Sequence, residues 1–173
     1  MIFGKNSYFC SLKFFEVEDQ KTYTISFKGL SLGSHIFDWV LDDRFFALYE
    51  MSEIGNASIG VQLTLVKHSR FLELNFILNG WAEVNCDRCL DPLNVEIKSE
   101  PRMFVKFGEH EGEDDSDDND VIFLPYGEDR LDVAHYLYEY AHLSLPLRRV
   151  HPDDANACNV EMIHKLEQYL VKN

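Results

Sequence analysis

Two cysteines separated by two residues, Cys86 and Cys89 in the stretch NCDRCLDP, are the side chains of this 173-residue protein best suited to chemistry. Thiolates at this spacing can both bind one tetrahedral metal ion, with Zn–S distances of about 2.3 Å. A closed structural site needs four ligands, and the chain contains no second CxxC motif. Cys158 would have to contribute, together with one histidine, for which the candidates are His151, His135, His142 and His164. The spacing therefore allows a zinc site without requiring one.

The same thiols have two other interpretations, which are a metal-free turn between two strands and a redox pair. In thioredoxin-like proteins the CxxC motif begins a helix, whose dipole lowers the thiol pKa, but here the flanking residues alternate as strands do. Asp87 between the cysteines would raise a thiol pKa, whereas Arg88 would lower it. The flanks disfavour a redox pair and leave the metal site and the metal-free turn open.

The one small basic element of the sequence is LPLRRVHP, in which Arg148 and Arg149 stand between two prolines. Two arginines can bind phosphate groups, but an ion-paired loop is the simpler interpretation. Together with Arg88, these two arginines are the candidates for contact with a partner or with RNA. The chain has no nucleophile elbow, Walker loop, dinucleotide-binding fingerprint or zinc-protease helix, and its histidines are scattered. We therefore expect a protein that is not an enzyme.

The net charge is −14, which argues against tight, non-specific binding to a polyanion. Eight of the acids lie in EHEGEDDSDDND, residues 109–120, so the rest of the chain is only mildly acidic. Such a run repels itself and predicts a flexible, solvated loop that could also meet a basic partner. It lacks the acid spacing and the turn glycine of a calcium-binding loop.

The sequence predicts a cytoplasmic protein without a membrane segment. No signal peptide is indicated at the start, and no run of about 18 apolar residues could span a bilayer. In a reducing compartment the four cysteines would be thiols, metal ligands or core residues and not disulfides. Cys10, in an apolar run, is expected to be buried.

Alternating apolar residues predict strands over most of the first hundred residues. The expected strands are 23–27, 36–41, 59–65, 72–78 continuing through 81–85, 93–97 and 121–125, with KHSR turning a long hairpin. Helical spacing predicts helices at 43–51, capped by Asp42 or Asp43, at 131–145, capped by Asp132, and at 159–173. The CxxC motif then lies at the bend between two strands.

This order of elements predicts a single α+β domain over residues 1–173. Its sheet should be largely antiparallel, as a partly open barrel or a sandwich-like fold, with helices mostly in the C-terminal third.

The block VNCDRCLDPL, followed by an acidic loop and then by LSLPLRRVHP and a third cysteine, resembles the YceD-like family of large ribosomal RNA subunit accumulation proteins. The resemblance extends from about residue 20 to residue 160. The matching positions are Cys86, Asp87, Arg88, Cys89, Leu90, Pro92, Asp132, Glu139, Leu143, Leu145, Pro146 and Cys158. The two blocks in this order are more specific than either block alone.

The resemblance implies a non-enzymatic role in accumulation or processing of large-subunit ribosomal RNA, and hence in ribosome assembly. The implied partners are the pre-ribosomal large subunit or ribosomal proteins, which are basic and would be attracted by an acidic loop. Direct RNA binding is less favoured than contact with ribosomal proteins, because the net charge is negative. The alternatives from the residues alone are a thiol-redox protein and a zinc-stabilised interaction module that uses Cys86 and Cys89.

Overall fold

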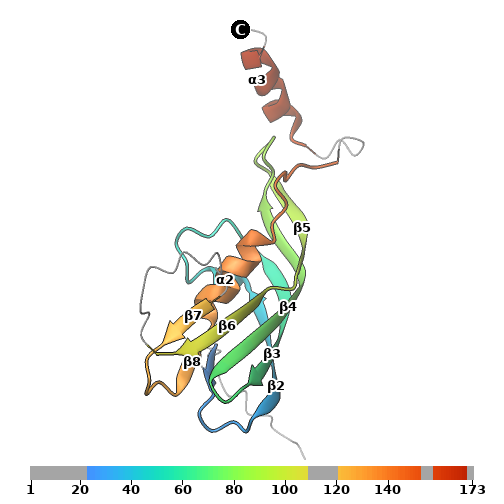
Figure 1. Cartoon of the computed structure of the whole chain (residues 1–173). Helices are drawn as coiled ribbons and strands as arrows, with labels where there is room; N and C mark the ends of the chain where they lie inside the picture. Colours follow the sequence, from blue (N-terminus) through green and yellow to red (C-terminus); the bar gives the residue numbers. More distant parts are fainter. Residues whose placement is uncertain (1–22, 109–120, 153–157, 171–173) are drawn as a thin grey trace, which may run out of the picture.

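A computed structural model describes residues 23–108, 121–152 and 158–170 (Figure 1). Within these ranges the chain forms eight strands and three helices. In chain order they are β1 (Thr24–Ser26), β2 (Gly33–Asp42), α1 (Asp43–Phe46), β3 (Ala57–Lys67), β4 (Phe71–Asn85), β5 (Pro92–Ser99), β6 (Arg102–Phe107), β7 (Val121–Leu124), β8 (Arg130–Asp132), α2 (Ala134–Leu143) and α3 (Val160–Leu170). Residues 1–22 with Cys10, and the acidic stretch 109–120, lie outside the described residues, so those two predictions have no structural counterpart here.

The main sheet has six strands and is built around β4, which is 15 residues long. One edge of β4 pairs with β3, and β3 pairs in turn with β2. The other edge pairs with β6 along the first part of β4 and with β5 along its last part. All these pairs are antiparallel, and β7 joins β6 in parallel. β1 and β8 form a separate two-stranded sheet. The predicted α+β class with a mostly antiparallel sheet is confirmed, and the described strands form an open sheet and not a closed barrel.

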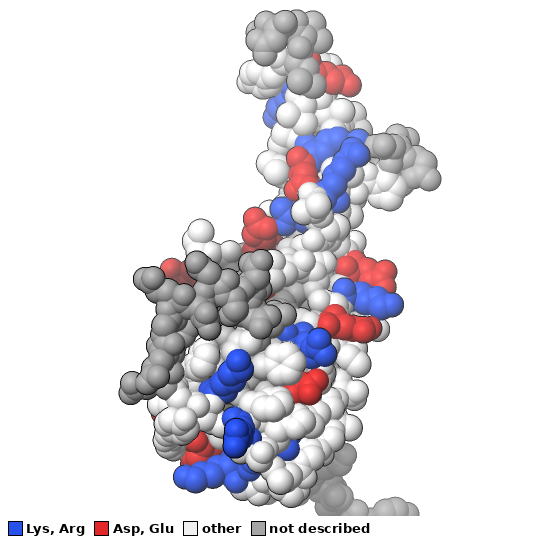
Figure 2. All heavy atoms as spheres, viewed as in Figure 1, with Lys and Arg blue, Asp and Glu red and all other residues white. Residues whose placement is uncertain are grey.

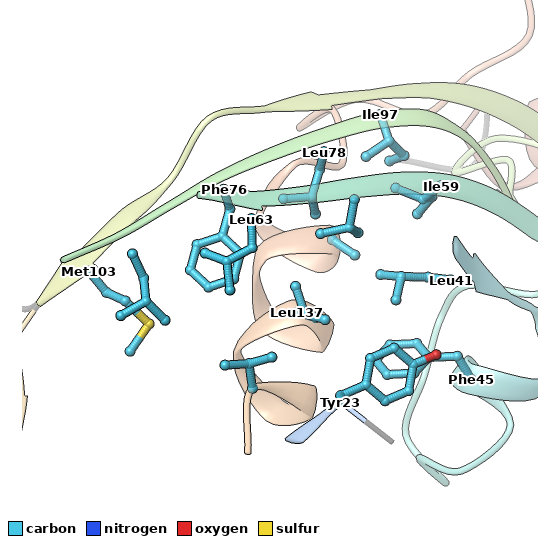
Figure 3. Packing of buried hydrophobic residues seen from close by; sticks show 14 of the residues in the cluster. Tyr23, Leu41, Phe45, Ile59, Leu63, Phe76, Leu78, Ile97, Met103 and Leu137 are labelled. Carbon is cyan, nitrogen blue, oxygen red and sulfur yellow. The ribbon is translucent and has the colours of Figure 1, made fainter. Parts of the chain in front are cut away.

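The core lies between one face of this sheet and the layer made by α1, α2 and the β1–β8 pair (Figures 1 and 3). Alternate residues of each strand point into it, because successive side chains of a strand point to opposite faces. From α2, Leu137 and Ala141 are fully buried against them. The sheet contributes residues such as Leu41, Ile59, Leu63, Phe76, Leu78, Ile97 and Met103, which Figure 3 shows converging on the helix.

Gly80 lets β3 and β4 approach each other closely in the middle of the sheet. A Cβ atom at this position would lie 2.7 Å from the Cα of Ile59 and still closer to the carbonyl oxygen of Ser58. Only glycine avoids this overlap without a shift of the backbone.

The first predicted helix is shorter than expected. Asp42, one of the two predicted caps, does accept a hydrogen bond from the backbone N–H of Phe45 at 3.3 Å. The helix ends at Phe46 and not at residue 51, because Leu48 is 73% exposed and the following residues form turns. The predicted spacing of apolar residues therefore holds for one buried turn only.

The helix predicted at 131–145 begins later, at Ala134. Residues 130–132 pair with β1 as strand β8, so Leu131 is buried as a strand residue. Asp132 accepts a hydrogen bond from the N–H of Ala134 at 2.9 Å, but Val133 occupies the cap position. The last predicted helix is confirmed as α3, and Asn159 accepts hydrogen bonds from the first N–H groups of that helix.

Candidate metal centre

The CxxC motif lies at the tip of the β4–β5 hairpin, between Asn85 and Pro92, as predicted. The N–H of Cys86 donates to the carbonyl of Asp91, and the N–H of Leu90 donates to the carbonyl of Cys86, both at 2.9 Å. Leu90 has a φ of 65°, in the left-handed region that residues other than glycine rarely adopt. This tight bend buries both thiols, with Cys86 0% and Cys89 1% exposed.

The C-terminal segment runs from the end of α2 to this hairpin tip and is attached there through its backbone. The N–H of Asp87 donates to the carbonyl of Arg149, and the N–H of Arg149 donates to a carboxylate oxygen of Asp87, both at 2.7 Å. The Arg149 guanidinium lies 2.6 Å from Glu53 Oε2 and 3.4 Å from Asp87 Oδ1. The hydrogen bond to Glu53, followed by the charges of both carboxylates, raises the pKa of Arg149. These contacts hold the segment in register with the bend.

Four side chains from the two segments meet at this point. The sulfur atoms of Cys86, Cys89 and Cys158 and a ring nitrogen of His151 all lie within 4.8 Å of one another. The Nδ1 atom of His151 is 3.5 Å from the Cys89 sulfur and 3.6 Å from the Cys158 sulfur. A tetrahedral zinc ion with Zn–S of about 2.3 Å and Zn–N of about 2.0 Å separates its sulfur and nitrogen ligands by roughly 3.5 Å. The spacing of the donor atoms therefore fits such an ion.

The ring of His151 is oriented for metal binding. Its Nε2 atom lies 3.1 Å from the carbonyl oxygen of Pro92. A carbonyl can only accept, so Nε2 carries the hydrogen, and the Nδ1 lone pair of the neutral ring faces the three sulfur atoms. A hydrogen bond of this kind, from the nitrogen that does not bind the metal to a backbone carbonyl, is the usual support of a histidine ligand.

Arg88 supports the cluster from within. Its Nε donates to the sulfur of Cys158 at 3.2 Å, and an Nη donates to the carbonyl oxygen of His151 at 3.1 Å. A positive donor beside a sulfur atom favours the thiolate, which is the form that binds metal.

The thiols do not titrate alike. Burial raises the pKa of Cys86, but hydrogen bonds from the backbone of Arg88 and Cys89 and from other groups of the site outweigh it and lower that pKa to about 6. Burial raises the pKa of Cys158, and the hydrogen bond from Arg88 only partly offsets this. Loss of hydration lowers the pKa of His151, yet hydrogen bonds to the thiols and to Pro92 raise it overall. The cluster thus favours one thiolate without metal, and a divalent ion would favour all three.

The other three candidate histidines lie elsewhere. His135 pairs with Glu139, His142 lies 3.4 Å from Ser52 Oγ, and His164 contacts Gln168. Among the candidate contact residues, Arg88 and Arg149 are engaged inside the site, while Arg148 is exposed. The supporting roles of Asp87, Glu53 and Pro92 had no signal in the sequence, because each residue contacts a partner 59 or more positions away that only the fold brings close.

An open, mostly antiparallel sheet whose β4–β5 hairpin ends in a Cys3His cluster, closed by a C-terminal segment, defines a small α+β protein with a candidate metal centre (Figure 1). Residues 74–169 match the model of the family described as YceD, large ribosomal RNA subunit accumulation protein. The chain belongs to this family, and the matched region contains all four residues of the cluster.

No curated protein and no solved structure matches the chain. Among the described residues, no helix has the length and apolar character needed to cross a membrane.

Proposed function

We propose that this protein is a non-enzymatic factor that supports accumulation and processing of large-subunit ribosomal RNA, and thereby ribosome assembly. The observation that carries the proposal is the family match over residues 74–169, whose description names accumulation of this RNA. The two blocks around the hairpin tip and the C-terminal segment, far apart in sequence, meet in one site within the matched region.

We further propose that Cys86, Cys89, His151 and Cys158 hold a zinc ion. Three sulfur donors and one neutral imidazole form a donor set typical of structural zinc. Four protein ligands complete the tetrahedron and leave no position for a substrate, which supports a structural role. When bound, the ion would neutralise the buried thiolates and join the hairpin tip to the C-terminal segment.

The burial of the cluster supports this role over a redox one. Disulfide exchange requires that a partner reach the attacking sulfur atom. Cys86 and Cys89 are 0% and 1% exposed, at a bend between two strands and not at the start of a helix. Arg88 and His151 both direct polar contacts toward the sulfur atoms and support holding an ion there.

The proposed partners are the pre-ribosomal large subunit and its ribosomal proteins, met in the cytoplasm. The net charge of −14, with eight acids in residues 109–120, favours contact with basic proteins.

Depletion of the protein from cells that express it tests the proposed function. Precursor and mature large-subunit RNA are then compared with small-subunit RNA, after complementation with wild type, Cys89→Ser or the control Arg44→Glu. We expect large-subunit RNA to fall selectively, and to be restored by wild type and the control but poorly by Cys89→Ser. Unchanged large-subunit RNA after depletion would contradict the proposed function.

A further inference from the structure

The outer face of the main sheet is left open by the described part of the chain. The core residues point to the other face, which α1, α2 and the β1–β8 pair cover. The outer side chains of neighbouring strands remain accessible, with Ile36 62%, Ile77 48% and Trp81 41% exposed. A sheet that presents large apolar and aromatic groups to solvent is a candidate interaction surface.

Aromatic and cationic side chains gather on this face where β4, β6 and β7 lie side by side. Phe71 and Phe104 have ring centroids 6.2 Å apart, and the guanidinium of Arg102 lies 5.5 Å from the Phe104 centroid. Lys106 stands opposite Phe71 on β4 and opposite Phe123 on β7. We call this set, with the exposed Arg70 in the β3–β4 turn, the aromatic–basic patch.

The patch reverses the charge of the molecule locally. The chain as a whole carries −14, yet among the residues that the structure describes Arg70, Arg102 and Lys106 are exposed here around one acid, Glu73. That carboxylate lies 3.6 Å from Nε2 of His68, whose ring stacks on Phe71 with centroids 4.2 Å apart. Figure 2 shows Lys and Arg gathered over this part of the sheet, beside uncharged surface. A locally positive surface on an acidic protein indicates an anionic ligand.

A shallow hollow continues the same face toward β2. It is lined by residues that include Asp38, Gly60, Gln62, Ile77 and Asn79. The Gln62 amide donates to the Asp38 carboxylate at 3.1 Å, and Gly60 leaves the hollow open because no side chain fills it. Amide groups beside an apolar floor can donate and accept hydrogen bonds with the edge of a base. Trp81, on the same face of β4, adds an exposed ring.

We propose that this outer face binds single-stranded RNA, with phosphates at Arg102, Lys106 and Arg70. The bases would lie against the rings of the patch, of which Phe71 and Phe104 are half-buried, and against the exposed ring of Trp81. Exposed rings stack on unpaired bases of any sequence, whereas bases inside a duplex are out of reach. Lys106 is of a type depleted in protein–protein interfaces, whereas the two arginines are not. All three cations can neutralise phosphates, so the charge of the patch favours RNA as the occupant. The inference rests on the proposed function, because it makes unpaired ribosomal RNA the natural ligand.

Fluorescence anisotropy with the full-length protein and a labelled, unstructured RNA of about twelve nucleotides tests the face, since known single-strand sites span about 4–16 nucleotides. The variant Arg102→Glu is compared with Arg44→Glu, which makes the same charge change on α1, on the core side of the sheet. We expect the first to weaken binding about fivefold or more and to reduce the salt slope by roughly 0.7, and the second to change binding less than about twofold. Phe104→Leu should weaken binding about fivefold or more through lost stacking, without a change in the salt slope.

Three results would overturn the inference. They are no binding by the wild type, equal weakening by the Arg44 control, or competition by a duplex of equal length as effective as that of the single strand. Loss of co-purified ribosomal proteins from Arg102→Glu with RNA binding intact would assign the face to a protein instead. If the protein binds RNA but its depletion leaves ribosomal RNA unchanged, the proposed function is contradicted, whereas the RNA-binding role of this face stands.

Discussion

Asp87 and Arg149, 62 positions apart, are joined by two hydrogen bonds of 2.7 Å in opposite directions, one between their backbones and one from the Arg149 N–H to the Asp87 carboxylate. One residue stands between the two cysteines of the hairpin, and the other stands two positions before His151. The pair therefore determines which residues of the C-terminal segment lie next to the hairpin tip. Because Arg149 is fixed beside Asp87, His151 lies close to the thiols.

Replacing Asp87 by alanine removes the acceptor for the Arg149 N–H and one of the two carboxylates beside the guanidinium. We expect the free energy of unfolding to fall by about 1 kcal/mol, since the contact is partly exposed. Metal affinity should fall by about tenfold, because the residue supports a ligand without being one. Chemical denaturation and a zinc-chelator competition measure the two effects. Asp129→Ala, at an exposed carboxylate 4.0 Å from Arg130, serves as the control and should change neither by more than about 0.5 kcal/mol.

Replacing Arg88 by methionine keeps much of the side-chain volume but removes the donors to the Cys158 sulfur and the His151 carbonyl. We expect metal affinity to fall by about tenfold to a hundredfold, with the zinc stoichiometry at saturation unchanged. Competition with a coloured chelator gives both values. A variant with wild-type affinity would show that Arg88 does not support the site.

Removing the metal should release α3 from the hairpin. Cys158 lies one residue before Asn159, the cap of the helix. Among the described residues, few hydrogen bonds join this end of the chain to the hairpin, such as those of Arg88 with Cys158 and of Asn159 with Asp91. Amide hydrogen exchange in a chelator should therefore rise strongly in residues 158–170 and around His151. Amides in the middle of β3, such as those of Val61 and Leu63, should keep their protection as an internal control. Equal protection of α3 with and without metal would contradict this coupling.

Tyr23 predicts a loss of stability at alkaline pH. Burial, followed by the negative charge of Asp42, raises its pKa to about 12 from the ordinary value of 10. The folded state therefore disfavours the tyrosinate, so the stabilising effect is complete below pH 10 and is lost as the pH rises toward 12. Tyr23→Phe should weaken this loss, whereas Tyr126→Phe, at a residue that is 79% exposed, should not. Denaturation curves at several alkaline pH values provide the measurement.

The long hairpin and the bend that carries the cysteines could be predicted because the inward residues of β3 and β4 alternate without interruption. The sequence does not indicate β6, because the apolar Phe104 lies between the buried Met103 and Val105 and hides the alternation. The predicted helix includes the end of β8, because Val133, Leu137 and Tyr140 fit a helical period and Asp132 just before them resembles a cap. In both cases the strand is defined by pairing with a distant segment.

The candidate site could be predicted in composition but not in geometry. Cys86 and Cys89 are linked by spacing, so their proximity follows from the sequence, and Cys158 was the remaining cysteine near a histidine. The choice of His151 among four histidines depends on the Asp87–Arg149 contact and on the carbonyl of Pro92. Arg88 has the charge expected of a partner contact, yet the fold turns it toward the sulfur atoms.

Elemental analysis of the purified full-length protein tests the central claim, that the hairpin tip and the C-terminal segment share one metal ion. We expect about one zinc per chain in the wild type and in Cys10→Ser, which changes the one cysteine outside the cluster, and much less in Cys158→Ser. Metal-free wild-type protein, or full zinc content in Cys158→Ser, would contradict the claim.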